Sequence, residues 1–232
     1  MTKQGFSEAM IGQLPQKRGY HAAVSVENIG TYLIGGAISN NARTTDFLEA
    51  SSKKWVAGPA IPVDMDEPCA VKISNQNFLI VSSSYIREYE VDITDPTSSS
   101  GWQSATKWPQ LQTSRIQNPG CSKIDNHVVF AGGWSSGFLQ STEVLDLTTK
   151  SLVNAGDLNT PRSYFHMATI RRDGQQLLLA FGGYTGPSSY LTSVEQFNPN
   201  NNTWTLAPTT MVRVRRLFAA VVVPTKMVCP TT

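Results

Sequence analysis

Charged residues are scarce in this chain of 232 residues. Asp, Glu, Lys and Arg make up 16% of it, against about 25% in typical globular proteins, and the formal net charge is only +2. With 40% hydrophobic residues and so little charge, the chain does not have the composition of a disordered protein. The small net charge also gives no electrostatic reason to expect nucleic acid or a membrane as a partner.

Long hydrophobic runs and helical patterns are missing as well. The longest apolar runs, such as residues 177–181 and 217–223, are far shorter than the ~20 residues that cross a bilayer. The first twenty residues contain no apolar signal core, and no segment shows a period of 3.6 residues. With 17 glycines and 13 prolines, the composition favours one soluble all-β domain of short strands and many turns.

No motif of a known catalytic or metal site is present. The chain has no nucleophile elbow, no phosphate-binding loop and no metal-binding helix motif. Its three cysteines, Cys69, Cys121 and Cys229, form no CxxC pair and no cluster with histidine, and their odd number argues against a complete disulfide framework. We therefore expect no catalytic residues, no metal and no cofactor.

What the chain does contain is an internal repeat, marked first by glycine pairs. A short apolar run ends in Gly-Gly at Gly35-Gly36, Gly132-Gly133 and Gly182-Gly183, and a similar run ends in Ser82-Ser83. The first residues of these pairs stand at 35, 82, 132 and 182, so the spacing is 47, 50 and 50 residues. A constant period of this size is typical of a propeller or another repeat architecture.

Two further series have the same period. A large apolar residue recurs at Phe6, Trp55, Trp102, Leu152 and Trp204, and an acidic residue precedes an apolar one at Asp46, Glu143 and Glu195. A His- or Cys-containing apolar stretch starts each unit, with basic residues before it. Each unit therefore predicts four strands, called a to d here: the starting stretch, the run into Gly-Gly, the acidic element and the Trp element. Asn, Asp and Gly in the turns supply the positive φ angles of tight hairpins.

These residues resemble the kelch repeat, which forms a four-stranded blade of about 50 residues in a β-propeller. Pro161-Arg162, His166, Gly182-Gly183, the Val194-Glu195 element and Trp204 carry the closest resemblance. The resemblance implies an all-β kelch-type propeller of four-stranded antiparallel blades, with four complete repeats and partial strands at both ends. The residues with a structural role in the repeat are Gly35, Gly36, Trp55, Trp102, Gly132, Gly133, Glu143, Gly182, Gly183, Glu195 and Trp204.

The repeat boundaries follow from this pattern. Residues 1–14 are expected to be the closing strand of a preceding blade, with Phe6 in the Trp position, and residues 209–232 the first strand of a further blade and a tail. Because the strands that would join these two ends are absent, we expect a part of a larger propeller or an arc of four blades. The blades are expected at 15–59, at 60–108 (a degenerate repeat), at 109–155 and at 156–208.

Several polar residues have both a structural and a functional interpretation. Asp46, Glu143 and Glu195 recur once per repeat, which favours contacts with a backbone or an arginine over catalysis. His21 and His166 are expected to be buried inner-strand residues hydrogen-bonded to backbone, and His127 an exposed or half-packed turn residue. Cys69 and Cys121 share a strand position in adjacent repeats and are expected to be free thiols, because inner strands of neighbouring blades are usually too far apart for a disulfide.

The loops joining strands b to c and d to a emerge on one face of a propeller, called the loop face here. Arg, Tyr and Trp are enriched at binding hot spots. Packing of the loop aromatics against strands remains an equal alternative. The predicted partner-binding residues are Arg18, Tyr20, Arg43, Arg115, Trp134, Phe138, Arg162, Tyr164, Tyr184, Tyr190, Arg213 and Arg215.

By resemblance, the chain is expected to be a non-catalytic module that binds another protein or a peptide through its loop face. A catalytic or carbohydrate-binding propeller and a secreted recognition module are the alternatives. Free thiols suit a reducing compartment such as the cytoplasm, whereas oxidised cysteines would favour an extracellular module. The one sequon, Asn201-Asn202-Thr203, lies in a turn whose chemistry already explains its asparagines, so glycosylation is not expected.

Overall fold

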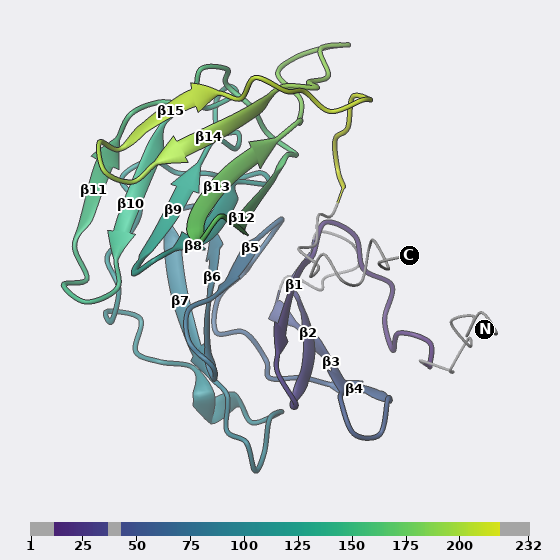
Figure 1. The fold of residues 1–232 in the computed structure, drawn as a ribbon. Helices are drawn as coiled ribbons and strands as arrows, with labels where there is room; N and C mark the ends of the chain where they lie inside the picture. The colour runs from purple at the N-terminus through teal and green to yellow at the C-terminus, as the bar shows by residue number, and fades with distance from the viewer. Residues whose placement is uncertain (1–11, 37–42, 219–232) are drawn as a thin grey trace, which may run out of the picture. The chain divides into compact units, whose positions relative to one another are not determined.

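The computed structural model describes residues 12–36 and 43–218, which form an all-β structure of four antiparallel sheets (Figure 1). No α-helix occurs within these two ranges. The chain divides into two compact units, one containing the residues up to Ile80 together with Arg87–Ser104, the other Val81–Ile86 together with the residues from Ala105 onward. Each unit is described separately below.

The first sheet contains β1 (Ala22–Val26), β2 (Gly30–Ile34), β3 (Thr45–Glu49) and β4 (Trp55–Ala57) in chain order. Its register pairs Ala22 with Ile34 and Leu48 with Trp55, so the Trp element is the fourth strand, as predicted. Asn28, with φ +62°, provides the left-handed residue of the first turn.

The second sheet has three strands, β5 (Cys69–Lys72), β6 (Asn77–Ser82) and β7 (Tyr85–Glu90). The fourth strand predicted here is not formed, because Trp102 makes only an isolated bridge to Tyr89. The chain before Trp102 contains a short 3₁₀ helix, Ser99–Gly101.

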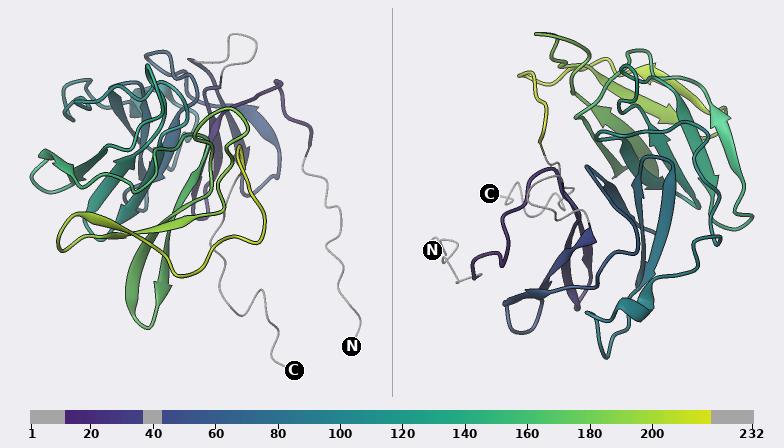
Figure 2. Two further views of the ribbon diagram at one scale, coloured as in Figure 1. Left: turned by 90° about the horizontal axis from the view of Figure 1, so that it is seen from above. Right: turned by 180° about the vertical axis from the view of Figure 1, so that it is seen from behind.

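The other two sheets have four strands each, again in chain order from one edge to the other (Figure 2). Each of the four sheets falls within one predicted repeat, while the repeat boundaries themselves stay a prediction. The strands are β8 (Gly120–Ile124), β9 (His127–Ala131), β10 (Thr142–Asp146), β11 (Leu152–Ala155), β12 (His166–Arg172), β13 (Gln175–Phe181), β14 (Val194–Asn198) and β15 (Thr203–Leu206).

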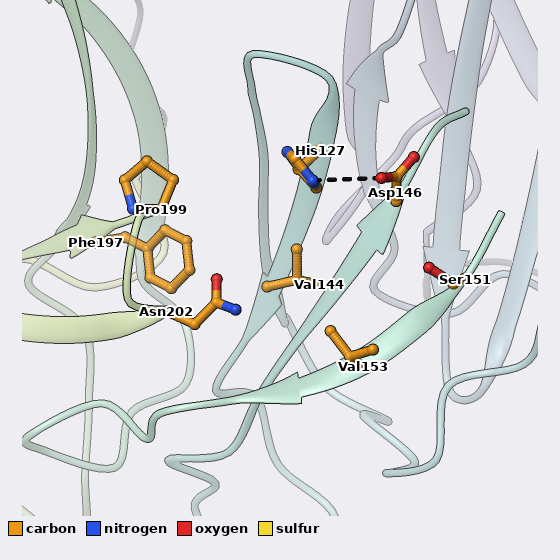
Figure 3. Close-up of a pocket in the computed structure, with 8 residues that line it drawn as sticks. All are labelled: His127, Val144, Asp146, Ser151, Val153, Phe197, Pro199 and Asn202. Atoms are coloured by element: carbon orange, nitrogen blue, oxygen red, sulfur yellow. Dashed lines mark ion pairs between the residues drawn. The ribbon is translucent and has the colours of Figure 1, made fainter. Parts of the chain in front are cut away.

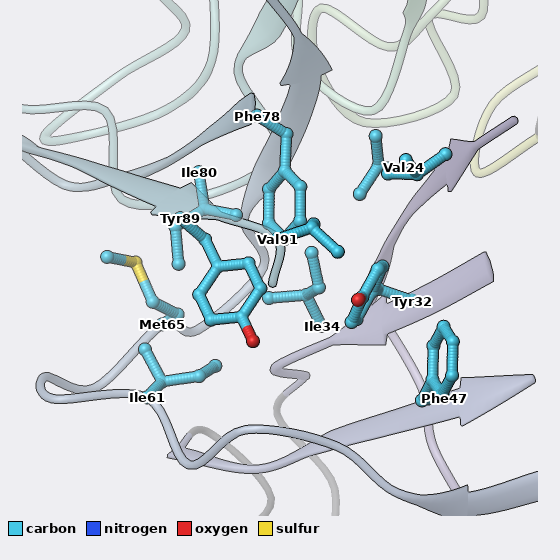
Figure 4. Close-up of a cluster of buried hydrophobic side chains, with 11 residues drawn as sticks. Val24, Tyr32, Ile34, Phe47, Ile61, Met65, Phe78, Ile80, Tyr89 and Val91 are labelled. Atoms are coloured by element: carbon cyan, nitrogen blue, oxygen red, sulfur yellow. The ribbon is translucent and has the colours of Figure 1, made fainter. Parts of the chain in front are cut away.

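An aromatic core fills the first unit (Figure 4). Tyr32 is its centre, with its ring centroid 4.6 Å from Phe47, 5.3 Å from Phe78 and 5.8 Å from Tyr89. The hydroxyl of Tyr32 donates to the carbonyl of Pro96 at 2.8 Å, so its buried polar atom has a partner. Burial and the neighbouring Tyr89 raise the pKa of Tyr32, which keeps its hydroxyl protonated.

The core of the second unit lies between neighbouring sheets, as the repeat predicts. Phe165, Met167, Leu178, Phe197 and Trp204 pack with residues of β8, β9 and β10. The indole of Trp204, on the outermost strand β15, donates to Thr142 Oγ1 of β10 in the preceding sheet at 2.9 Å. This side chain thereby connects two neighbouring repeats. One four-stranded sheet cannot cover its own faces, so stacking supplies most of the burial.

The glycine pairs are the points where consecutive repeats meet. Gly132 has φ +58°, and a Cβ built on it would lie 2.5 Å from the carbonyl oxygen of Arg162. The second residue of each pair donates its amide to the loop of the following repeat: Gly36 to Met65, Ser83 to Arg115, Gly133 to Arg162 and Gly183 to Arg215. The hydrogen bond from Gly183 to Arg215, which follows β13, thus repeats the contact made at the other three pairs.

Two predicted end strands cannot be assessed. Phe6, most of residues 1–14 and residues 219–232 lie outside the described residues. Leu217 nevertheless has φ +53°, as Tyr164 has φ +54°, and its amide donates to the Tyr164 carbonyl at 3.0 Å. The start of a further repeat at residues 209–232 stays a prediction, supported by this recurrence.

Substituting Gly132→Ala tests the glycine at the junction. We expect the free energy of unfolding to fall by about 1–3 kcal/mol, because an L side chain at this φ is strained and meets the Arg162 carbonyl. Gly137→Ala is the matched control, since a Cβ there meets nothing within 4 Å. Urea unfolding of both variants measures the effect, and equal stabilities would contradict it.

Candidate functional site

Three arginines predicted on the loop face are instead buried inside the repeats. The side chains of Arg18, Arg115 and Arg162 have a relative exposure of 0%, and each forms an ion pair with a buried carboxylate. Their assignment as partner-binding residues is wrong. The physical reason is that each of these three repeats places one carboxylate near the start of strand c, where an arginine from the preceding loop pairs with it.

The arginine contacts are nearly identical in the three repeats. Nη1 donates to the carbonyl of the first glycine of the pair, from Arg18 to Gly35 at 2.9 Å, from Arg115 to Gly132 at 2.7 Å and from Arg162 to Gly182 at 2.8 Å. The same nitrogen also contacts the carbonyl of the residue two before the acid, namely Thr44, Ser141 or Ser193. Each guanidinium thus joins the end of strand b to the start of strand c.

The carboxylates complete this arrangement, which we call the arginine clamp (Arg18–Asp46, Arg115–Glu143 and Arg162–Glu195). Glu143 accepts the backbone amides of Gln112 and Thr113 at 2.7 and 3.1 Å. Glu195 accepts the amides of Asn159 and Thr160 at the same two distances. The predicted structural role of these acids, contacts with backbone and with an arginine, is confirmed.

Burial has a measurable electrostatic consequence in the clamp. Desolvation lowers the pKa of Arg115 and of Arg162, and the paired carboxylates Glu143 and Glu195 act in the opposite direction. A buried charge with good hydrogen bonds is tolerated, whereas one without its partner is costly. The clamp therefore belongs to stability and not to recognition.

The second repeat replaces both members of the clamp. Met65 occupies the arginine position, because it stands two residues before a left-handed residue, Glu67 with φ +47°. Arg18 and Arg162 likewise stand two residues before the left-handed residues Tyr20 and Tyr164. Arg87, two residues before Tyr89, stands at the position of the acids. Met65 is fully buried and Arg87 is 7% exposed, so this repeat keeps both positions buried.

Besides Arg18, two predicted loop-face residues lie in the first unit. Tyr20 is exposed and has φ +59°. Arg43 is exposed, and its Nε donates to Asp64 Oδ1 at 2.6 Å, a pairing that holds the pKa of Asp64 below its usual value. Both side chains are accessible to a partner, although the guanidinium of Arg43 already forms an ion pair with Asp64.

The second unit brings together an aromatic group at the ends of its sheets. Tyr184 lies at its centre, with ring centroids 5.2 Å from Phe138, 5.5 Å from Tyr190 and 6.5 Å from Tyr164. Isolated backbone bridges join Tyr184 to Tyr190 and Trp134 to Phe138. These contacts hold the loops after β9 and β13 against one another.

Some of these aromatic side chains pack against the loops and others are accessible to a partner. Trp134, Phe138, Tyr164 and Tyr184 are half-buried, so part of their surface packs against the loops, while Tyr190 is 42% exposed. The hydroxyl of Tyr164 donates to Gln117 Oε1 at 3.1 Å. The sequence could not distinguish these cases, because the environment of a loop side chain depends on the neighbouring loop.

Arg216 is a residue that the sequence analysis did not select. Its guanidinium carbon lies 5.1 Å from the ring centroids of both Tyr184 and Tyr190, the distance of a cation–π contact. Arg213 and Arg215 lie beside it in the chain and are exposed. The cluster of three arginines within four residues was a signal, but only the fold shows which of them meets the tyrosines.

A pocket of about 200 Å³ lies elsewhere in the same unit, between β10, β11 and the turn after β14 (Figure 3). In it His127 Nε2 is 3.6 Å from Asp146 Oδ2. His127 is half-buried, as predicted. Within residues 12–36 and 43–218, no group of three or more His, Cys, Asp or Glu side chains could hold a metal ion.

The other two histidines differ from expectation. His21 is exposed and precedes β1, and His166 is half-buried at the start of β12, 6.3 Å from the Phe218 ring. Desolvation lowers the pKa of both imidazoles, with Arg18 contributing at His21. Their prediction as buried, backbone-bonded residues is wrong for His21, because the backbone enters the strand only after it.

The prediction of free thiols is also wrong: Cys69 and Cys121 are both disulfide-bonded. Each lies on an edge strand of its sheet, β5 and β8, and is only half-buried, so its sulfur is not enclosed in a core. Cys229 lies outside the described residues.

Four antiparallel sheets with recurring glycine pairs and clamps define an all-β protein of the kelch-type β-propeller class. A family comparison agrees, since the Kelch motif matches residues 174–211, which contain β13, β14 and β15. The chain thus contains a Kelch motif, and its repeated antiparallel sheets support a kelch-type propeller. No curated protein matches it. Within the described part of the chain, no helix is long and apolar enough to cross a membrane.

Removing one member of a clamp should destabilise the protein. For Arg162→Met we expect a loss of about 3–5 kcal/mol in the free energy of unfolding, because Glu195 stays buried without its cation. Arg172→Met is the control, since that side chain is 75% exposed. Thermal and urea unfolding followed by circular dichroism measure both, and an Arg162 variant as stable as the control would refute the role of the clamp.

Proposed function

We propose that the chain is a protein-recognition module whose contact surface is the aromatic group of the second unit with Arg216. Kelch-repeat domains typically bind proteins and are generally non-enzymatic, which agrees with this role. The observation that supports it most directly is the pair of neighbouring tyrosines, Tyr184 and Tyr190, whose ring centroids both lie 5.1 Å from one exposed guanidinium. Tyr and Arg are the residues most enriched at binding hot spots.

The charges around this surface favour an acidic partner segment. Arg213, Arg215 and Arg216 are exposed, and Asp157 is the exposed carboxylate of the loops that we assign to this face. No ion pair with these three arginines occurs among the described residues. A carboxylate-bearing peptide with an aromatic or aliphatic side chain would complement both the charge and the rings.

The first unit contributes a smaller set of accessible residues to the proposal. Tyr20 and Arg43 stay candidates for partner contacts in that unit, with Arg43 the weaker because Asp64 already pairs with it. Arg18, Arg115 and Arg162 are not part of the proposed contact surface, because their side chains are buried. A catalytic function has less support than recognition, because the three acids that recur in the repeats are all used by the clamps.

A secreted recognition module is a second candidate, and one observation favours it. Disulfide bonds persist in oxidising compartments and are rare in the cytosol. Both Cys69 and Cys121 are disulfide-bonded, which weakens the earlier preference for a reducing compartment. The two candidates share the same contact surface and differ in where the partner is found.

Selection of displayed random peptides on the whole chain tests the surface. We expect the selected peptides to be acidic, and their affinity to fall about tenfold or more for Arg216→Glu and for Tyr190→Ala, since each removes a central contact. The affinity should also fall with rising salt, because exposed charges are screened.

Two variants serve as controls. Arg172→Glu carries the same charge change on another exposed arginine, and Leu206→Ala removes another exposed apolar side chain. Both should bind selected peptides as the parent chain does. Selected peptides without acidic residues, or equal losses in the control variants, would contradict the proposed surface.

A further inference from the structure

The turn between β14 and β15 presents the side-chain amide of Asn201 at the surface. It begins after Asn198, whose side-chain oxygen accepts the amide of Asn200 at 3.0 Å, and ends at Thr203, which pairs with Asn198 in the sheet register. Asn202 takes the left-handed conformation with φ +54°, and its carbonyl accepts the Gly156 amide at 2.7 Å. Asn201 and Thr203 are exposed.

Asn201, Asn202 and Thr203 form the one Asn-x-Thr sequon of the chain, and Asn202 is not a proline. The Thr203 hydroxyl donates to Asn201 Oδ1 at 2.7 Å, so the two side chains that define the sequon are in direct contact. Turn chemistry explains Asn198 and Asn202 through their hydrogen bonds and φ angle. It assigns no comparable role to the amide nitrogen of Asn201, for which no partner occurs within the described residues.

The state of the cysteines favours the compartment in which this modification takes place. Asn-linked glycans are added in the compartment in which secreted proteins also form their disulfides. Cys69 and Cys121 are both disulfide-bonded, and neither belongs to the turn. The sequon and the disulfide-bonded cysteines therefore both indicate the secretory compartment, although they come from different parts of the chain.

We propose that Asn201 is an acceptor site for an asparagine-linked glycan. The donor would be an oligosaccharide joined to a lipid through pyrophosphate. Asn201 Nδ2 forms a bond to the anomeric carbon of the first sugar while the bond from that carbon to the pyrophosphate oxygen breaks. The proton of Nδ2 passes to a base of the transferase, and the lipid pyrophosphate leaves.

The fold accommodates such a group without loss of packing. On β15 only Trp204 is buried, and its indole is held by Thr142, while Thr203, Thr205 and Leu206 face solvent. The glycan would extend from the tip of the hairpin, away from the aromatic group and from the core.

Secretion of the whole chain from insect cells behind a leader peptide tests the proposal. We expect one glycan, released by peptide N-glycosidase with conversion of Asn201 to Asp in the peptide mass spectrum. Asn201→Gln and Thr203→Ala should abolish the mass shift. Asn200→Gln and Thr203→Ser are the matched controls, because both keep the sequon intact, and both should be modified like the parent chain.

Circular dichroism and thiol titration establish that each secreted variant is folded with Cys69 and Cys121 oxidised. A parent chain that is secreted, folded and oxidised but carries no glycan overturns the proposal. A glycan that persists in Asn201→Gln overturns it as well, since the modified residue would then be another one. Binding of the selected acidic peptides is independent of both outcomes, so failure here leaves the recognition surface untouched.

Discussion

The buried arginine clamp is the interaction on which the architecture of this protein depends. A guanidinium offers five donors in a rigid plane, and in three repeats it uses them on the end of strand b, the start of strand c and a carboxylate. The carboxylate in turn accepts loop amides in the third and fourth repeats. One charged pair thereby satisfies the backbone groups that a Gly-Gly corner would otherwise leave buried and unpaired.

The same corner also joins one repeat to the next. The second residue of each pair donates to the backbone of the following loop, at the residue in the arginine position. Glycine is required where this approach is closest, as at Gly132, while Ser83 shows that the hydrogen bond itself does not need it. Where the residue in that position is Arg115 or Arg162, its carbonyl accepts the hydrogen bond from the preceding repeat and its side chain forms the clamp of its own repeat. The order within a repeat is thereby coupled to the stacking between repeats.

Arginine has two opposite uses in this molecule. In the clamps it is enclosed and its charge is balanced, whereas Arg216 stays exposed and is oriented by two tyrosine rings. An exposed cation whose neighbours are aromatic rings is not neutralised by a carboxylate of the described residues and is available for an acidic ligand. The recognition surface and the stabilising clamps thus use the same residue type at different depths. The glycan site proposed at Asn201 lies on a hairpin tip and competes with neither.

The all-β class, the strands and the structural role of Asp46, Glu143 and Glu195 were predictable from the sequence, because period, glycine pairs and turn residues are local properties of the chain. The depth of a side chain is not local. Arg18, Arg115 and Arg162 look like loop residues in the sequence, and only the return of strand c brings a carboxylate to them. The missing fourth strand before Trp102, the meeting of Arg216 with Tyr184 and the oxidation of Cys69 and Cys121 likewise depend on which segments the folded chain places within contact distance.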